Sequence, residues 1–148
     1  MSERYHLNNE KLIIANCSGF FGDRFSAAQE MVQGGPIHFL TGDYLAELTM
    51  AILLRKQFKD PNAGYVTTFL KQMEVVMGEC LDRRIKVVAN AGGLNPASLA
   101  KELEKVAGSL GLRPKIAYVE GDNLMQRLQD LQDKGEPFTH KYTGIPLK

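Results

Sequence analysis

The residues of this chain that could carry out chemistry fall in four short polar segments. Each segment follows a short apolar run, and together they offer carboxylates, side-chain amides, a hydroxyl and several glycines. Carboxylates can act as general acids or bases, while amides and backbone N–H groups can orient a polar ligand. The candidates are Asn16, Ser18, Gly19, Asp23, Asp43, Glu47, Asn90, Gly92, Gly93, Asn95, Glu120 and Asp122.

Asp23, Asp43 and Glu47 are the candidates for catalysis, and the others are candidates for ligand binding. Asp43 and Glu47 are four residues apart at a predicted helix start, so they can share one face. Two neighbouring carboxylates repel each other, and this repulsion raises the pKa of one of them unless a hydrogen-bond donor or a cation such as Arg24 lies between them. In the alternative interpretation Asp43 only caps the helix, and Glu47 is exposed and far from Asp23.

Residues 90–95 form the second candidate site, for an anion. Gly92 and Gly93 would let a ligand approach the backbone, and Asn95 before Pro96 predicts a helix start whose dipole favours negative charge. The segment matches neither common phosphate-binding pattern, so the motif is weak by itself. For Asn95 taken alone, capping the helix is the simpler explanation.

No metal site and no particular cofactor are predicted. The acidic residues show no metal-binding spacing, and Cys17 and Cys80 form no CxxC motif. We expect Cys17 to be a small buried thiol, because no histidine lies near it in the sequence to activate it.

Short apolar runs alternate with longer helical patterns along the chain. Four strands are expected, at residues 11–15, 37–40, 85–89 and 115–119. Helices are expected from a capping box at Ser26 and Gln29, over residues 45–58, along the apolar period 66–81, from Pro96 to a left-handed Gly111, and from about Leu124. The helix over 45–58 is apolar on most sides, so we expect it to be mostly buried.

This order, βαβααβαβα, predicts an α/β fold with an open parallel four-stranded sheet covered by helices, which could be part of a larger α/β domain. The expected division is a tail at 1–10, the α/β domain at 11–133 and a linker or extended tail at 134–148. Parallel strands end at one edge of the sheet, where open α/β folds bind ligands. The four polar segments should therefore meet at that edge.

Composition excludes several functions. The chain has 148 residues, of which 44% are hydrophobic and 24% charged, and its formal net charge is +1. Such a balance gives no reason to expect binding to nucleic acid or to a membrane surface. The longest apolar stretch is far shorter than the roughly 20 residues of a membrane span. Residues 1–10 have no apolar core of a signal peptide, so we expect a cytoplasmic protein.

Read together, the polar segments resemble the acyclic terpene utilisation (AtuA) family block by block and in the same order. The matching blocks are residues 16–24, 41–50, 60–65, 90–96 and 120–122, and the likeness covers about residues 11–124. The resemblance implies a part in the bacterial breakdown of acyclic terpenes such as citronellol and geraniol, through coenzyme A thioesters. Family members are usually several times longer, so we expect an N-terminal fragment or a truncated gene product.

Two classes of function remain open. The first is an enzyme, such as a lyase or hydratase, that acts on a small-molecule carboxylate or acyl-CoA by acid–base chemistry at the sheet edge. The second is a non-catalytic subunit or scaffold beside an acyl-CoA carboxylase or another pathway enzyme. The first needs a perturbed carboxylate shielded from water, and the second needs a large exposed apolar surface. The expected partners are the rest of a longer protein, a partner subunit or a second copy.

Overall fold

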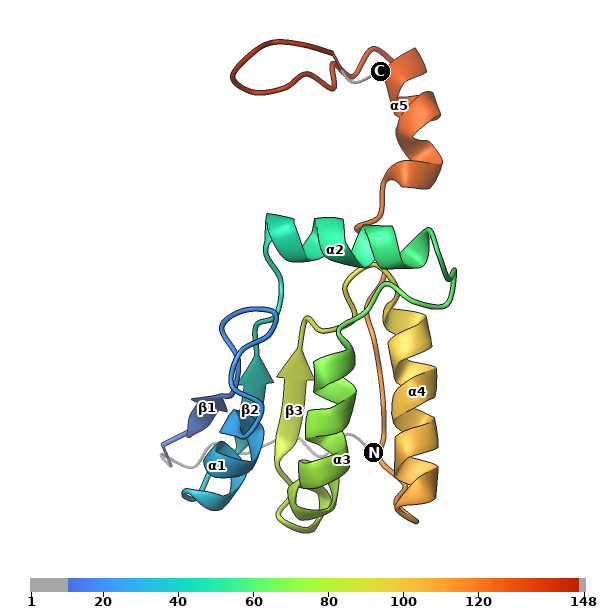
Figure 1. The fold of residues 1–148 in the computed structure, drawn as a ribbon. Helices are drawn as coiled ribbons and strands as arrows, with labels where there is room; N and C mark the ends of the chain where they lie inside the picture. Colours follow the sequence, from blue (N-terminus) through green and yellow to red (C-terminus); the bar gives the residue numbers. More distant parts are fainter. Residues whose placement is uncertain (1–10, 147–148) are drawn as a thin grey trace. The chain divides into compact units, whose positions relative to one another are not determined.

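The structure is a computed structural model that describes residues 11–146 of the chain. It divides into two compact units, Met1–Tyr118 and Val119–Lys148, which are described separately (Figure 1). The first unit contains β1 (Ile14–Asn16), α1 (Ala27–Gln33), β2 (Phe39–Gly42), α2 (Glu47–Gln57), α3 (Thr67–Asp82), β3 (Lys86–Ala89) and α4 (Pro96–Ser109). The second contains a short 3₁₀ helix, η1 (Met125–Arg127), which runs directly into α5 (Leu128–Asp133).

The sheet is parallel throughout, as the alternation of strands and helices predicts. Its order is β1-β2-β3. Ala15 lies beside Leu40, and Leu40 lies beside Val87, so these three side chains form one row across the sheet. The described residues contain three strands and not the expected four, and the prediction of a strand at 115–119 is wrong.

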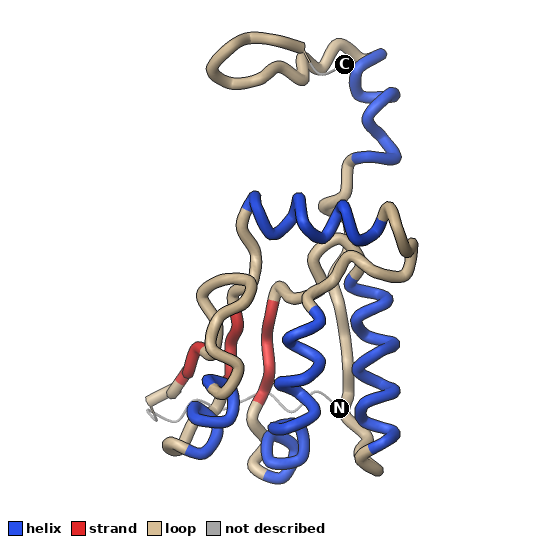
Figure 2. Tube along the Cα trace, in the orientation of Figure 1, coloured by secondary structure: helices blue, strands red, loops and turns tan. Residues whose placement is uncertain are grey.

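The segment after α4 is extended but unpaired, and it is drawn as a loop in Figure 2. Leu112, Pro114 and Ile116 are half-buried while their neighbours are exposed, which is the alternation of a strand with one covered face. Pro114 has no N–H to give to a ladder. Tyr118 is 52% exposed and Val119 is 91% exposed. An apolar run becomes a strand only where a neighbour accepts its hydrogen bonds.

Three helices, α1, α3 and α4, pack together with one face of the sheet to form the core. The apolar period of α3 is confirmed, since it buries Phe69, Met73, Val76, Met77 and Cys80. The row Ala15, Leu40 and Val87 belongs to the same core cluster. The core therefore follows the two periodicities seen in the sequence, one helical and one of strands.

The opposite face of the sheet is more open. The rows that alternate with the core row include Ile14 and Val88, each 57% exposed. Parallel sheets are normally covered on both faces. This unit therefore presents apolar strand side chains that a parallel sheet usually hides.

Helix α2 was expected to be mostly buried, and this prediction is wrong. The helix buries only Thr49 and Leu53, while Leu48 is 74% exposed. Figure 1 shows α2 lying across the carboxyl ends of the strands. Of its other apolar residues, Met50 and Ile52 are half-buried, and Ala51 and Leu54 are exposed.

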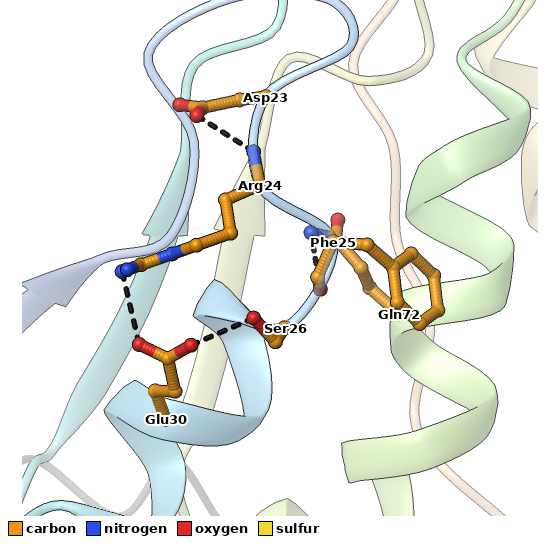
Figure 3. A network of polar contacts seen from close by, with 6 residues as sticks. All are labelled: Asp23, Arg24, Phe25, Ser26, Glu30 and Gln72. Atoms are coloured by element: carbon orange, nitrogen blue, oxygen red, sulfur yellow. Dashed lines mark hydrogen bonds and ion pairs between the residues drawn. The ribbon is translucent and has the colours of Figure 1, made fainter.

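The helix ends show which local signals the fold obeys. Asn95 caps α4 as predicted, because its Oδ1 accepts a hydrogen bond of 3.1 Å from the Ser98 N–H. The capping box at Ser26 is not formed. Ser26 already has helical backbone angles, φ −71° and ψ −11°, and its hydroxyl donates to Oε1 of Glu30 at 2.7 Å (Figure 3). An N-cap residue needs an extended backbone for its side chain to reach the free N–H groups.

Helices α3 and α4 end in the same backbone motif with different residues. After α4, Gly111 is left-handed at φ 69°, as predicted, and the Leu112 N–H donates to the Ala107 carbonyl at 2.8 Å. After α3, Arg84 takes this place at φ 57°, and the Ile85 N–H donates to the Cys80 carbonyl at 2.7 Å. Both ends are Schellman motifs, but only glycine adopts the left-handed conformation without a steric cost.

We expect Arg84→Gly to raise the free energy of unfolding by about 0.5–1 kcal/mol, because it relieves the left-handed strain at the end of α3. The matched exchange Gly111→Arg should lower it by about 1 kcal/mol. Urea unfolding followed by circular dichroism measures both. A destabilised Arg84→Gly variant would mean that the arginine side chain contributes more than its backbone strain costs.

Candidate functional site

The three strands of the sheet bring their polar loops to one edge, at the carboxyl ends seen in Figure 1. Backbone hydrogen bonds continue past the strands into these loops. The Cys17 N–H donates to the Thr41 carbonyl at 2.8 Å, and the Asp43 N–H donates to the Ser18 carbonyl at 2.9 Å. The loops after β1 and β2 are therefore held side by side, as the parallel arrangement predicts.

Asp43 and Asn90 form the centre of this edge. The Asn90 Nδ2 donates to Oδ1 of Asp43 at 2.6 Å, and the Asn90 Oδ1 accepts from the Tyr44 N–H at 2.8 Å. The Leu45 N–H also reaches Asp43 Oδ1, at 3.4 Å. One amide thus joins the loop after β3 to the loop after β2, and it fixes the Asp43 carboxylate, which remains exposed.

Asn16 and Ser18 are also at this edge, but their side chains serve the loop itself. The Thr41 hydroxyl donates to Oδ1 of Asn16 at 3.1 Å, and the Asn16 Nδ2 donates to the Ser18 carbonyl at 2.8 Å. Ser18 is 2% exposed, and its hydroxyl donates to the Phe20 carbonyl at 3.1 Å. Asn16 is exposed and could still meet a ligand, whereas Ser18 is out of reach of one.

Asp23 closes its own loop. Its Oδ2 accepts from the Gly19 N–H at 2.9 Å. Its Oδ1 accepts from the Arg24 N–H at 2.7 Å, as Figure 3 shows. These bonds, first the one from Gly19 and then the one from Arg24, hold the pKa of the Asp23 carboxyl below its usual value. The Arg24 guanidinium forms an ion pair with Glu30 at 2.9 Å (Figure 3).

Glu47 is exposed at the first residue of α2. Because the helix begins at Glu47 and its N-cap is Ala46, Asp43 lies outside the helix and the two carboxylates do not share a helical face. Within residues 11–146, no hydrogen bond or ion pair links Asp23 to Asp43 or Glu47. The structure joins Asp43 to Asn90 by a hydrogen bond, Asp23 accepts its hydrogen bonds from its own loop, and Glu47 is exposed at the start of α2.

The two glycines after β3 have structural reasons to be glycine. A Cβ on Gly92 would lie 2.7 Å from Cβ of Pro96. Gly93 has φ +54°, and a Cβ there would lie 2.5 Å from Cδ1 of Leu53 and 2.7 Å from the Gly64 carbonyl oxygen. Both positions are close backbone approaches within the protein, whether or not a ligand also uses them.

Most donors of the loop over residues 90–95 already have protein acceptors. The N–H groups of Gly93, Leu94 and Asn95 donate to the carbonyls of Asn90, Gly64 and Gly92, at 2.9–3.1 Å. The Asn95 Nδ2 donates to the carbonyls of Pro61, at 3.2 Å, and Ala63, at 3.1 Å. This pattern weighs against an anion at the start of α4, since its donors would have to break existing bonds first.

Glu120 and Asp122 belong to the second unit and are exposed. They were expected at the sheet edge because a fourth strand should precede them. That strand is absent from the described residues, so the reason for expecting them there is lost.

A buried polar cluster beneath the edge was not expected from the sequence. Tyr44 is 2% exposed, and its hydroxyl donates to Oε1 of Gln72, itself 3% exposed, at 2.5 Å. The Sγ of Cys17 lies 3.8 Å from the same hydroxyl oxygen. Burial raises the pKa of both Tyr44 and Cys17, which agrees with Cys17 as a buried thiol rather than a nucleophile. The one available signal was a glutamine at a buried position of the α3 period.

Two further kinds of site receive no support from the described residues. No group of three or more His, Cys, Asp or Glu side chains within 11–146 could hold a metal ion. In the same range, no helix has the length and apolar character needed to cross a membrane.

The architecture and this edge define an α/β protein with a polar rim at the carboxyl ends of a parallel sheet. The sequence matches the family model described as acyclic terpene utilisation family protein AtuA over residues 12–148, so the chain belongs to that family. The match extends beyond the five blocks on which the resemblance was recognised. None of the curated proteins and none of the solved structures matches the chain.

We expect Asp23→Asn to destabilise the protein at neutral pH, and this cost should shrink in acid. A carboxyl whose folded-state pKa is lowered contributes stability above its unfolded pKa, about 3.9, and the contribution is lost as the pH falls through the folded value. Urea unfolding at pH 7 and at about pH 3 measures this. The exposed Glu74→Gln on α3 is the control. An equal cost of Asp23→Asn at both pH values would contradict the role of the ionised form.

We expect Tyr44→Phe to lower the free energy of unfolding by about 1–3 kcal/mol, because it leaves the buried Gln72 carbonyl oxygen without its donor. The control Tyr65→Phe should change stability by less than about 0.5 kcal/mol, since Tyr65 is only partly buried and has no side-chain hydrogen bond among the described residues. Equal effects of the two substitutions would rule out a special role for the Tyr44 hydroxyl.

Proposed function

We propose that this chain acts in acyclic terpene utilisation as a ligand-binding part whose site is completed by another polypeptide surface. The observation that carries the proposal is that the three acidic candidates have different partners. Asp23 is held by N–H groups of its own loop, Glu47 faces solvent at the start of α2, and only Asp43 stands at the rim beside Asn90.

The Asp43–Asn90 pair favours a ligand that donates a hydrogen bond. Oδ1 of Asp43 already accepts from Asn90 and from the Leu45 N–H, whereas Oδ2 of this exposed residue has no donor among residues 11–146. A carboxylate accepts well from a hydroxyl group, and the bond is stronger for being charge-assisted. An acyclic terpenoid alcohol or hydroxy acid presents such a hydroxyl, whereas a bare carboxylate would meet like charge.

Exposed apolar surface supports the incompleteness of the site. Leu48 on α2 and Ile14 and Val88 on the sheet are more than half exposed. Asp43 and Asn90 are also open to solvent, so water is not excluded from the rim. A covering surface would lower the local dielectric and strengthen the polar contacts beneath it.

An enzyme of the lyase or hydratase type, acting on a carboxylate or acyl-CoA, is the second candidate. It is favoured by Asp43 itself, a single carboxylate whose position is fixed by an amide, which suits a general base. Such a base also needs to be shielded from water to be tuned. The enzyme would therefore require the same completion, with Asp43 as the proton acceptor.

Isothermal titration of the full chain with geraniol, citronellol and their acids tests the proposal. We expect the alcohols to bind more tightly than the acids, and Asp43→Asn to weaken alcohol binding by about tenfold, as for a lost charge-assisted hydrogen bond. Glu47→Gln, which removes an exposed charge in the same segment, should leave binding unchanged. Equal affinity of the Asp43→Asn variant, or tighter binding of the acids, would show that the rim does not recognise a hydroxyl in this way.

A further inference from the structure

Helix α2 has a polar residue on its buried side and apolar residues on its exposed side. The side packed on the unit carries Thr49, 4% exposed, and Leu53, 0% exposed. The outward side carries exposed apolar residues, Leu48 at 74% and Leu54 at 42%, and it continues into the C-cap residue Phe58 at 81%. In a monomeric protein, a surface helix normally turns its largest apolar residues inward and its polar residues outward. The outward side of α2 is therefore a surface made to be covered.

The contacts of the inner side fix the helix on the rim. Leu53 packs against the Gly93 position, where a Cβ would lie 2.5 Å from its Cδ1. Lys56 Nζ lies 5.4 Å from the centre of the Phe21 ring, in the loop after β1. Because these contacts fix the rotation of α2 about its own axis, the same residues always form its outward face.

The outward residues of α2 form a pattern that is symmetrical about Ala51. At 100° per residue, the residues within about 60° of Ala51 form a single stripe. A leucine lies three residues before Ala51 and another three after it. An acidic residue lies four before it and a basic residue four after it. The stripe is made of Glu47, Leu48, Ala51, Leu54, Arg55 and Phe58, all of them exposed.

A two-fold axis through Ala51 relates the two leucines and the two charges of this pattern, while Phe58 has no exposed counterpart because the residue seven before Ala51 is the buried Tyr44. Two antiparallel helices that cross at Ala51 place Leu48 of one copy beside Leu54 of the other, and Glu47 beside Arg55. In a two-fold interface each contact occurs twice, so apolar residues must be placed symmetrically and charges must be opposite. A small residue at the crossing lets the backbones approach, and antiparallel helix dipoles attract.

We propose that α2 is a dimerisation helix, on which a second copy of this chain docks through its own α2 in the antiparallel orientation, with the two Ala51 residues at the two-fold axis. The charges distinguish this occupant from a lipid surface, because membrane-bound helices border their apolar face mainly with Lys and Arg. Here one acidic and one basic residue stand at equal distances from the centre, so the stripe is complementary to itself. The inference does not depend on the ligand proposed above.

Cross-linking of the full chain tests the geometry. Ala51→Cys should form a disulfide-linked dimer under mild oxidation, because symmetry brings the two introduced thiols together at the crossing. The native Cys17 and Cys80 are each 3% exposed and should not compete. Val75→Cys is the matched control, because Val75 is an exposed apolar residue, at 50%, on α3. Equal cross-linking of the two variants, or none at Ala51→Cys, overturns the proposal.

Sedimentation equilibrium of charge variants tests the pairing. At about 100 µM we expect the wild-type chain to contain a dimer, in the affinity range of small interfaces. Glu47→Arg and Arg55→Glu should each weaken association by at least about tenfold, since each places like charges together twice. The double variant should recover to within about threefold of wild type. A monomeric wild-type chain, or a double variant as weak as the single ones, would falsify the model of paired α2 helices.

Discussion

The edge of the sheet depends on the burial of one side chain, Tyr44. Its backbone N–H donates to Asn90, its hydroxyl donates to Gln72 on α3, and its ring meets Phe69 edge-on with centroids 5.7 Å apart. Gly42 leaves the space for that ring, since a Cβ there would lie 2.6 Å from it. Through this residue the end of β2 is joined to the loop after β3 and to the main core helix. The position of the neighbouring Asp43 follows from this anchor.

The sequence predicted the helix ends that are determined by one or two neighbouring residues. Asn95 before Pro96 marks the start of α4, and Gly111 marks its end, because each residue type has one strongly preferred role at such a position. The end of α3 carried no such signal. Arg84 takes the left-handed conformation where the chain turns to bury Ile85, 6% exposed, just before β3, so tertiary packing overrides the preference of the residue.

Non-local outcomes were harder to predict. The run over 115–119 has the composition of a strand, but pairing depends on a neighbour that composition does not reveal. The rim was predicted in outline, since Asp43, Asn16 and Asn90 do meet at one edge of the sheet. No hydrogen bond or ion pair within residues 11–146 joins the proposed trio of Asp23, Asp43 and Glu47. Its spacing argument placed Asp43 and Glu47 on one face at the start of a helix over residues 45–58, whereas α2 begins at Glu47. The hydrogen bond between Tyr44 and Gln72 was not predicted, because it joins residues 28 positions apart in the sequence.

The contact between Leu53 and Gly93 joins the helix α2 mechanically to the loop that carries Asn90. Gly93 lies three residues after Asn90, and its N–H donates to the Asn90 carbonyl at 3.1 Å. A displacement of α2 would therefore be passed on directly to the loop after β3. Leu53 is buried, and Gly93 has no side chain that could change its conformation to absorb the movement. The amide that orients Asp43 is at the other end of that short path. A protein that binds α2 therefore also acts on the position of Asp43 and Asn90.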